Sequence, residues 1–542
     1  MGDIEMKKKL IFGHGFVLTL FIAVCTSFMD LKEINGCGLS DKKSNDESLP
    51  LDSIQPDGRD KFNSNTAKGI GRQGRWFTYD GQPTYLVGFD SQELACDPTI
   101  DYVAALDQFV KYRINKVRIW TYCWFGTTSF KALTPWVREQ TGLFNLDQWN
   151  PEFWERTKDF LISARDRKIT VEITVFAPYP GWAAWWRDDG VPDTDLFKIA
   201  WNKKNNVNGV FSSNARGLFQ SEFFNLNHPE VSHSGRRLRD YQQDLVDKVI
   251  SEFGAFENVY IEVCNEFGTY DLDVDTWHPW QLEWARRINE TASNMVAVHA
   301  GWDKEGPFRP KHYWDSKFVD IMNFRLRGSP QEVSDALHYS QLKGKILSVN
   351  ETPGFPENKE DFHNDLDRHT RFAWAIFMAG GHVGFYEDNS SRIGSQGWVN
   401  GAQRLKALRE IAEKVSFWKL SPVNKKGVEY DRLIKKGPTG AGHQLLANPG
   451  SEYVAYFWGS QSANAVRIRL PAGAYSYKWY DVRDASLIKD GKVVRSTPGV
   501  VKIASPAITA WNPDSGLALI VKASKGKETA IWKQSHAQIA SQ

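Results

Sequence analysis

The chain has 542 residues, with 67 Lys and Arg against 65 Asp and Glu, so its formal net charge is only +2. This balance lacks the basic excess of a nucleic-acid-binding protein, and we expect no nucleic-acid partner. Hydrophobic residues make up 41% and charged residues 24%, which excludes disorder over most of the chain. Aromatic residues reach 13%, with 22 Trp, and a tryptophan face suits either a packed core or stacking on sugar rings.

The N-terminus has the pattern of an export signal. Three lysines at 7–9 precede an apolar run over 10–24, so residues 1–40 are interpreted as a signal segment of a secreted, periplasmic or outer-surface protein. Cleavage near Cys25 is one alternative. The other is a lipoprotein box, Ile34-Asn35-Gly36-Cys37, whose lipidated Cys37 would attach the chain to a membrane. Residues 41–70, rich in Asp, Ser, Asn and Lys, predict a flexible tether.

Three cysteines remain beyond the export region, namely Cys96, Cys123 and Cys264. Their spacing matches no zinc-binding pattern. The sequence is compatible with a Cys96–Cys123 disulfide and equally with buried free thiols.

The middle of the chain alternates between strand and helix patterns. Asp80-Gly81 predicts a hairpin between residues 75–79 and 82–88. Apolar runs of strand length lie at 84–89, 116–120, 170–176, 259–264, 295–299, 319–324, 345–349 and 382–386. Helical patterns lie at 99–112, 151–167, 234–253, 279–294, 330–342 and 361–378. Eight such repeats predict an α/β fold, a closed (β/α)₈ TIM barrel over residues 71–420. No glycine-rich phosphate loop follows the first run, which argues against a nucleotide-binding fold.

Two glutamates stand where the active site of such a barrel lies, at the C-terminal ends of its strands. Glu266 follows the fourth run and Glu351 follows the seventh, each directly after an asparagine. Hydrolysis of a glycosidic bond needs one carboxylic acid to protonate the leaving oxygen and one carboxylate to attack the anomeric carbon or activate water. We predict that Glu266 and Glu351 are this catalytic pair. Glu387 and Asp388 are rival carboxylates after the eighth run.

Further polar and aromatic residues at the strand ends are candidates for binding substrate. Arg118 is expected to hold Glu351 ionised, and Asn265 to bond a sugar 2-hydroxyl. The candidate substrate-binding residues are Asn265, Arg118, Asp90, Trp120, Trp124, Trp182, Trp186, His299 and Tyr386. No metal or organic cofactor is expected, because no His pair or ligand cluster stands at the strand ends.

Other residues of the same kinds are expected to be structural. Glu172, Glu262 and Cys264 should fill layers inside the barrel. Trp154, Trp284 and Trp374 fall in predicted helices and should pack in the core. The long loop 178–228 carries several Trp and Asn residues, which favours either binding of a polyhydroxylated ligand or packing of the loop on itself.

Three motifs resemble those of the clan A glycoside hydrolases. The segment Ile261-Glu262-Val263-Cys264-Asn265-Glu266 resembles their strand-four motif, Ser348-Val349-Asn350-Glu351 their strand-seven motif, and Lys116-Val117-Arg118-Ile119 their strand-two arginine. The family 5 cellulase-like enzymes are the nearest reference, and the apiosidase-like group has a similar barrel followed by a small β-domain. The resemblance implies double displacement with retention, with Glu266 as acid/base and Glu351 as nucleophile.

The chain departs from that family pattern at two places. Many members carry Tyr or His at the end of strand six, where this chain has Asn323-Phe324-Arg325. Many carry a Trp sugar platform at the end of strand eight, where this chain has Tyr386-Glu387-Asp388.

The C-terminal part changes to short strand patterns after a predicted last helix at 405–419. The runs lie at 427–434, 443–447, 453–458, 465–470, 475–481, 493–496, 500–503 and 517–522. They predict an all-β sandwich over residues 421–523, with a hairpin turn at Lys489-Asp490-Gly491-Lys492 and a disordered tail over 524–542. The β-domain is expected either to pack on the barrel as a structural companion or to bind carbohydrate.

These patterns together predict an exported, retaining glycoside hydrolase that cleaves β-glycosidic bonds in a polysaccharide or oligosaccharide. The alternative is a non-catalytic carbohydrate-binding surface protein built on a barrel scaffold. A metal-dependent hydrolase is disfavoured by the missing ligand cluster.

Overall fold

The computed structural model describes most of the chain between residues 68 and 524. The described ranges are 68–121, 132–176, 200–201, 203–210, 223–229, 231–265, 274–299, 311–325, 344–351, 365–387, 390–422, 434–436, 442–459 and 465–524. The predicted export segment, the tether up to residue 67, the helix 330–342 and the tail from residue 525 lie outside them, and these stay predictions. In the described part of the chain, no helix is both long and apolar enough to cross a membrane.

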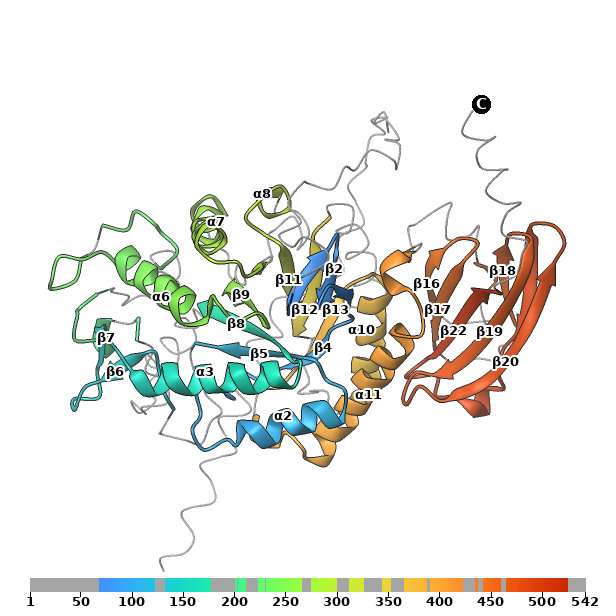
Figure 1. Cartoon of the computed structure of the whole chain (residues 1–542), viewed down its shortest axis with the longest axis horizontal. Helices are drawn as coiled ribbons and strands as arrows, with labels where there is room; N and C mark the ends of the chain where they lie inside the picture. Colours follow the sequence, from blue (N-terminus) through green and yellow to red (C-terminus); the bar gives the residue numbers. More distant parts are fainter. Residues whose placement is uncertain are drawn as a thin grey trace, which may run out of the picture. The chain divides into compact units, whose positions relative to one another are not determined.

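Eight parallel strands close into a barrel (Figure 1). They are β4 (Val87–Asp90), β5 (Lys116–Trp120), β8 (Thr170–Phe176), β9 (Val259–Cys264), β10 (Val296–His299), β11 (Ile321–Arg325), β12 (Ile346–Glu351) and β13 (His382–Tyr386). Each strand pairs with the next in this order, and β13 pairs back onto β4. The predicted TIM barrel is confirmed, and the predicted bounds of β5, β8, β9 and β13 match residue for residue.

The helices of the barrel pack against the outward side chains of the strands. They are α2 (Tyr102–Lys111), α3 (Pro151–Asp166), α6 (Leu238–Phe253), α7 (Val274–Thr291), α8 (Lys311–Trp314), α10 (Leu366–Met378) and α11 (Gln396–Ala412) (Figure 1). On β4, for example, Phe89 packs against Phe109 of α2 and Trp398 of α11. Trp154, Trp284 and Trp374 are buried, as predicted for packing residues.

Four helix starts differ from the prediction by four or more residues: α6 and α10 begin later than predicted, and α7 and α11 begin earlier. Helix α11 begins at Gln396 instead of residue 405, because the Ser395 side chain accepts the backbone N–H of Trp398 and this N-cap outweighs two early glycines. Helix α7 begins at Val274, so Pro279 lies inside it rather than at its start. A proline there removes one backbone hydrogen bond without stopping the helix.

A small antiparallel sheet covers the residues at which several barrel strands begin. It consists of β1 (Ile70–Gln73), β2 (Trp76–Tyr79) and β3 (Gln82–Pro83). The predicted hairpin is confirmed, and both turn residues, Asp80 and Gly81, have positive φ angles of 51° and 74°. Phe77 packs in one cluster with Tyr260 of β9, Ala297 of β10 and Ile321 of β11. Apolar side chains thereby close the N-terminal end of the barrel interior.

The C-terminal part forms two packed antiparallel sheets, which confirms the predicted sandwich. One contains β14 (Ser421–Pro422), β16 (Gly442–Asn448), β17 (Glu452–Trp458), β22 (Leu517–Ala523), β19 (Gly473–Asp481) and β20 (Leu487–Arg495). The other contains β15 (Ile434–Lys436), β18 (Ala465–Leu470) and β21 (Gly499–Ala504). A second hydrophobic core, which includes Phe457, Ile468 and Trp479, lies between them.

The predicted turn at residues 489–492 is wrong. These residues lie inside β20, where Asp490 pairs with Lys478 and Gly491 with Tyr477. The chain turns earlier, where Ala485 has a positive φ of 61°. A Cβ built on Gly491 would lie 2.4 Å from the Tyr477 hydroxyl oxygen, so the tyrosine side chain covers the glycine and replaces the packing that the glycine lacks.

Side chains of the β-domain contact helix α10. Trp374 stacks on Tyr456 of β17, with ring centroids 5.2 Å apart and planes 19° apart. Asp367 of α10 accepts a hydrogen bond of 3.0 Å from Asn512. These contacts agree with a structural companion, and carbohydrate binding by the β-domain stays a prediction.

His382 at the start of β13 leads to a prediction on acid stability. Its ring stacks on Tyr85, and its Nδ1 accepts the backbone N–H of Leu86 at 3.0 Å. Burial, with the nearby charge of Lys116, lowers its pKa from 6.5 to about 3. Because the unfolded chain binds this proton below pH 6.5 and the folded chain does not, His382 costs about 1.4 kcal/mol of stability per pH unit below 6.5.

Replacing His382 with Asn keeps an acceptor but removes the titrating ring. The variant should be less stable than the wild type at pH 7.5, because it loses the aromatic packing. The difference in unfolding free energy should shrink by about 1.4 kcal/mol at pH 5.5. Urea unfolding at both pH values measures it, and an unchanged difference would contradict the prediction.

Candidate active site

Arg118 of β5 lies at the centre of a buried polar network inside the barrel. Its Nη1 lies 3.1 Å from Asp90 Oδ2 of β4, and its Nη2 donates to Glu262 Oε2 of β9 at 2.5 Å. The same Nη2 donates to Asn265 Oδ1 at 2.5 Å, and Nε donates to the Thr174 hydroxyl at 2.9 Å. All five side chains are buried. The guanidinium of Arg118 therefore connects its own strand β5 with β4, β8 and β9, because its planar group offers five N–H donors.

Two carboxylates share two side-chain amides next to this arginine. The Asn323 amide of β11 donates to Glu172 Oε1 at 2.6 Å and to Glu262 Oε1 at 2.7 Å. The Asn350 amide of β12 donates to the same two oxygens at 2.8 Å and 3.2 Å. The Tyr260 hydroxyl donates to Glu172 Oε2 at 2.7 Å. Glu172 and Glu262 thus fill a layer of the barrel, as predicted.

The surroundings of the two carboxyls push their pKa values apart. Burial alone would raise the pKa of Glu172, but the charges of Lys116 and Arg118 lower it below its ordinary value. Burial raises the pKa of Glu262 above its ordinary value, and the negative charge of Glu172 adds to this against the effect of Arg118. Glu172 therefore keeps its charge more readily than Glu262 does.

The network brings together three of the predicted binding residues, Asp90, Arg118 and Asn265. Trp120 ends β5 and is buried, and its ring lies 5.3 Å from the Arg118 guanidinium, so its predicted stacking on sugar stays a prediction. His299 and Tyr386 are the last residues of β10 and β13. His299 is buried, and Gln281 of α7 bonds both its backbone N–H and its carbonyl at 3.1 Å.

The predicted catalytic pair lies at the edge of the described residues. Glu351 is the last residue of β12, and its side chain is outside the description, as is the whole of Glu266, two residues after β9. Trp124, Trp182, Trp186 and Asp388 also lie outside the described residues. The expected contact of Arg118 with Glu351 stays a prediction, and Glu387 is buried after β13.

The described part of the long loop 178–228 packs on itself and on its neighbours. Trp201 is buried and contacts the rings of Trp136 and Phe223. The Asn206 amide donates to the carbonyls of residues 200 and 210 at 3.0 and 3.1 Å. The Asn208 amide donates to Asp147 Oδ2 at 2.6 Å. In these residues the amides hold the chain in shape, which favours the structural interpretation for this part of the loop.

The cysteines divide between the two expected states. Cys96 takes part in a disulfide, and Cys264 is a buried free thiol whose pKa is raised by burial. Cys123, the expected partner of Cys96, lies outside the described residues.

A metal-ion site and a surface cavity are two other features that could indicate function in the described ranges. No three or more His, Cys, Asp or Glu side chains in them form a group that could hold a metal ion. A cavity of about 580 Å³ is lined by Leu282 and Arg286 of α7 and by His312 of α8. None of the predicted site residues lines this cavity.

The sequence patterns did not single out Lys116, Asn323 or Asn350 as parts of the network. Lys116 could have been found, because it stands two residues before Arg118 in an otherwise apolar strand and so points to the same face. In the sequence, Asn323 stands out only as a departure from the family pattern. Its partners lie 61 and 151 residues away in the chain, so no local signal identifies them.

Two solved structures with a similar fold are glycoside hydrolases. A glycoside hydrolase family 5 structure from Bacteroides vulgatus matches with a TM-score of 0.54 and 12% identity, covering 85% of this chain and 94% of its own. A structure described as a glycoside hydrolase matches with a TM-score of 0.51 and 12% identity, covering 86% and 98%. No family model and no curated protein sequence matches this chain. At such identity the likeness shows the fold alone, and this chain folds like solved glycoside hydrolases of family 5.

Proposed function

We propose that this protein is a retaining glycoside hydrolase that cleaves β-glycosidic bonds in a polysaccharide or oligosaccharide. Glu351 attacks the anomeric carbon and forms a glycosyl–enzyme intermediate. Glu266 protonates the leaving oxygen and then takes a proton from the attacking water. The carbohydrate is the substrate, and the reaction requires no metal or organic cofactor.

One observation carries this proposal, namely the buried network that joins the two asparagines next to the proposed catalytic glutamates. Arg118 bonds Asn265, which directly precedes Glu266, and the same arginine bonds Glu262. Glu262 in turn accepts from Asn350, which directly precedes Glu351. Strands β9 and β12 are parallel members of one barrel and so end on the same side, β12 at Glu351 and β9 two residues before Glu266. The family 5 fold adds support by analogy.

The alternative is a non-catalytic carbohydrate-binding protein. It shares the barrel and the expected sugar contacts, and the two proposals differ only in turnover. Double displacement requires a protonated acid and an ionised nucleophile, here Glu266 and Glu351. A binding protein does not need two carboxyl groups in opposite protonation states.

A screen of β-linked glycans and aryl β-glycosides tests the proposal. Wild-type protein is incubated with each substrate, and the first product is followed by ¹H NMR to assign its anomeric configuration. We expect a β-configured product, because two displacements restore the starting configuration. An α-configured first product would contradict retention, and binding of a glycan without turnover would favour the alternative.

The Glu266→Gln variant separates the role of the acid from that of the nucleophile. Without the acid, hydrolysis of substrates with poor leaving groups should fall about 10²- to 10⁴-fold. Dinitrophenyl glycosides need no protonation of the leaving group, so formation of their glycosyl–enzyme should be nearly unaffected. Steady-state and burst kinetics measure both. Equal losses with both substrates would contradict the assignment of Glu266.

A further inference from the structure

Lys116 is a buried cation with three acceptors. It is the first residue of β5 and is almost completely buried. Its Nζ lies 2.8 Å from Glu172 Oε2 and donates to Ser348 Oγ at 3.0 Å and to Asn350 Oδ1 at 3.1 Å. An ammonium has three donors, so all of them are used. Burying such a charge costs several kcal/mol, and charge neutralisation alone would need only the contact with Glu172.

The Asn350 side chain is held on both sides. Its Oδ1 accepts from Lys116 and from the Ser348 hydroxyl, at 3.1 Å each. Its Nδ2 donates to Glu172 and Glu262. An amide has two donors and two acceptor positions, and here all four are occupied. The amide therefore has one orientation. Lys116 can only donate, so the amide atom that faces it is the oxygen.

The backbone of β12 is irregular at the same residue. Val349 pairs with Phe324 of β11, but the next pair joins Arg325 to Glu351, so Asn350 is an extra residue opposite β11. Such a bulge interrupts the strict alternation of side chains, and bulges next to active sites re-aim the residue that follows. Holding Asn350 therefore sets the course of the chain into Glu351.

Strands β4 and β13 approach the backbones of Lys116 and Asn350 so closely that only glycine fits at the point of contact. A Cβ on Gly88 of β4 would lie 2.3 Å from the Lys116 carbonyl oxygen. A Cβ on Gly384 of β13 would lie 2.6 Å from the Asn350 carbonyl oxygen. The two glycines pair with each other across β4 and β13. Lys116 and Asn350 are thus each closely approached by the backbone of a neighbouring strand.

We propose that Lys116 is a positioning residue for Glu351, which it orients by fixing the Asn350 amide at the bulge of β12. Lys116 does not touch substrate in this proposal, and its kinetic consequence rests on the proposed function. The competing explanation is that Lys116 only neutralises Glu172. The two explanations differ in what happens when both charges of the Lys116–Glu172 pair are removed together.

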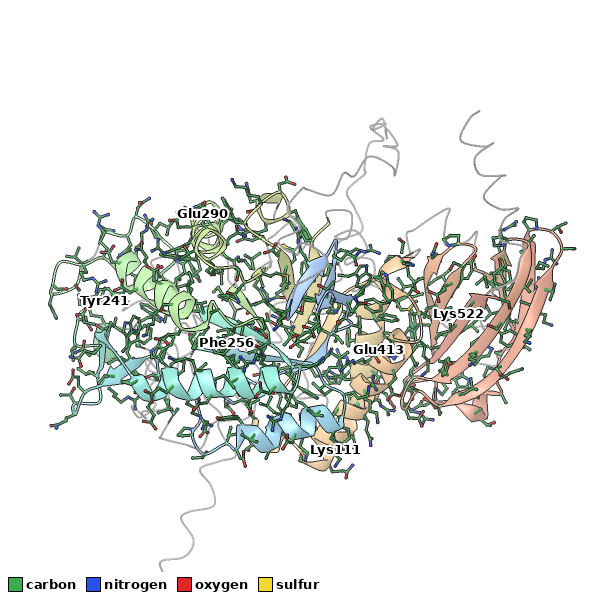
Figure 2. The ribbon with its side chains drawn as sticks, viewed as in Figure 1. Lys111, Tyr241, Phe256, Glu290, Glu413 and Lys522 are labelled. Atoms are coloured by element: carbon green, nitrogen blue, oxygen red, sulfur yellow. The ribbon has the colours of Figure 1, made fainter. Side chains whose placement is uncertain are left out.

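The test therefore uses the double variant Lys116→Met/Glu172→Gln in the full chain. Removing both charges leaves no unpaired buried ion, so the barrel should fold. The glutamine at position 172 would still present an oxygen to Asn350, whereas the methionine at position 116 offers no donor to the Asn350 oxygen. Lys111→Met, at the last residue of α2, makes the same lysine replacement outside the network and is the matched control (Figure 2).

Two measurements decide the proposal. With the best substrate from the screen, kcat of the double variant should fall about 10- to 100-fold with KM within about twofold, because misplacement of a reacting group by about 1 Å has such an effect. In crystal structures of wild type and double variant, the Asn350 amide should turn or the pairing at residues 349–351 should shift.

The outcomes separate this proposal from the proposed function. Unchanged kcat together with a superimposable β12 would overturn the positioning role. A wild type that hydrolyses no glycan would overturn the proposed function, while the crystal structures would still show whether Lys116 holds Asn350. An equal loss of kcat in Lys111→Met would show that the effect is not specific to the network. It would overturn the claim that Lys116 supports catalysis by positioning Glu351.

Discussion

Replacing Glu351 with alanine is expected to lower kcat by on the order of 10³-fold or more, with little change in thermal stability. The residue ends β12, and retention requires a carboxylate that forms a bond to the anomeric carbon. Without it, neither the covalent intermediate nor the stabilisation of the positive charge that develops on the sugar is available. Steady-state kinetics on an aryl β-glycoside from the screen measure the loss.

Azide distinguishes a lost nucleophile from a damaged fold. Alanine leaves space where the carboxylate would be, and a small anion can enter it and attack the anomeric carbon. Azide should therefore restore release of the aryl group from Glu351→Ala and yield an α-glycosyl azide, since only one displacement takes place. Mass spectrometry and NMR identify this product. No rescue, or a β-configured azide, would contradict the assignment of Glu351.

Two other glutamates provide the comparison. Glu290→Ala removes an exposed carboxylate of α7, which is paired with Arg286, and should leave kcat unchanged (Figure 2). Glu387→Gln changes the rival carboxylate after β13. If this variant lost hydrolysis while Glu351→Ala kept it, the role of nucleophile would pass to Glu387.

The barrel could be predicted because its strands are short apolar runs separated by helical patterns. Strands buried on both sides read as continuous runs, so β8 and β9 were bounded correctly. A local turn pattern misleads where neighbours in space decide the structure. Asp490-Gly491 has the sequence of a tight turn, but pairing with β19 and the cover of Tyr477 keep it in a strand.

The sequence predicts which residues lie near the candidate site, but it does not predict which side chains form hydrogen bonds and ion pairs with one another. Strand ends placed Asp90, Arg118 and Asn265 near one another, and the structure joins them through hydrogen bonds. Which carboxylate Arg118 contacts depends on the stagger between strands, and the sequence does not reveal it. The described partners are Asp90, Glu172 and Glu262, and the predicted contact with Glu351 stays a prediction, because that side chain lies outside the described residues.

Replacing Arg118 with methionine should destabilise the barrel by about 3–5 kcal/mol, because buried carboxylates then lose their shared cation. Asp90, Glu172 and Glu262 all lie within 4 Å of this guanidinium. Methionine fills part of the volume, so the loss comes mainly from uncompensated charge rather than from a cavity. Thermal and urea unfolding of the variant at pH 7.5 measure it.

The size of the loss should depend on pH in a defined direction. The pKa of Glu262 is already raised by burial, and removing Arg118, which lowers it, should raise it further. A carboxyl whose folded pKa exceeds its unfolded pKa binds more protons when folded, so its contribution to stability falls as pH rises through that interval. Arg118→Met should therefore be destabilised less, relative to wild type, at pH 5 than at pH 8.

A double variant tests whether charge is the cause. Glu262→Gln removes one of the uncompensated carboxylates, and a glutamine can still accept from Asn323 through its side-chain oxygen. Arg118→Met/Glu262→Gln should thus recover part of the stability lost in Arg118→Met, and its stability relative to wild type should vary less between pH 5 and pH 8. If the double variant is less stable than the single one and has the same pH dependence, Arg118 acts through packing, and the charge-based account of the network is wrong.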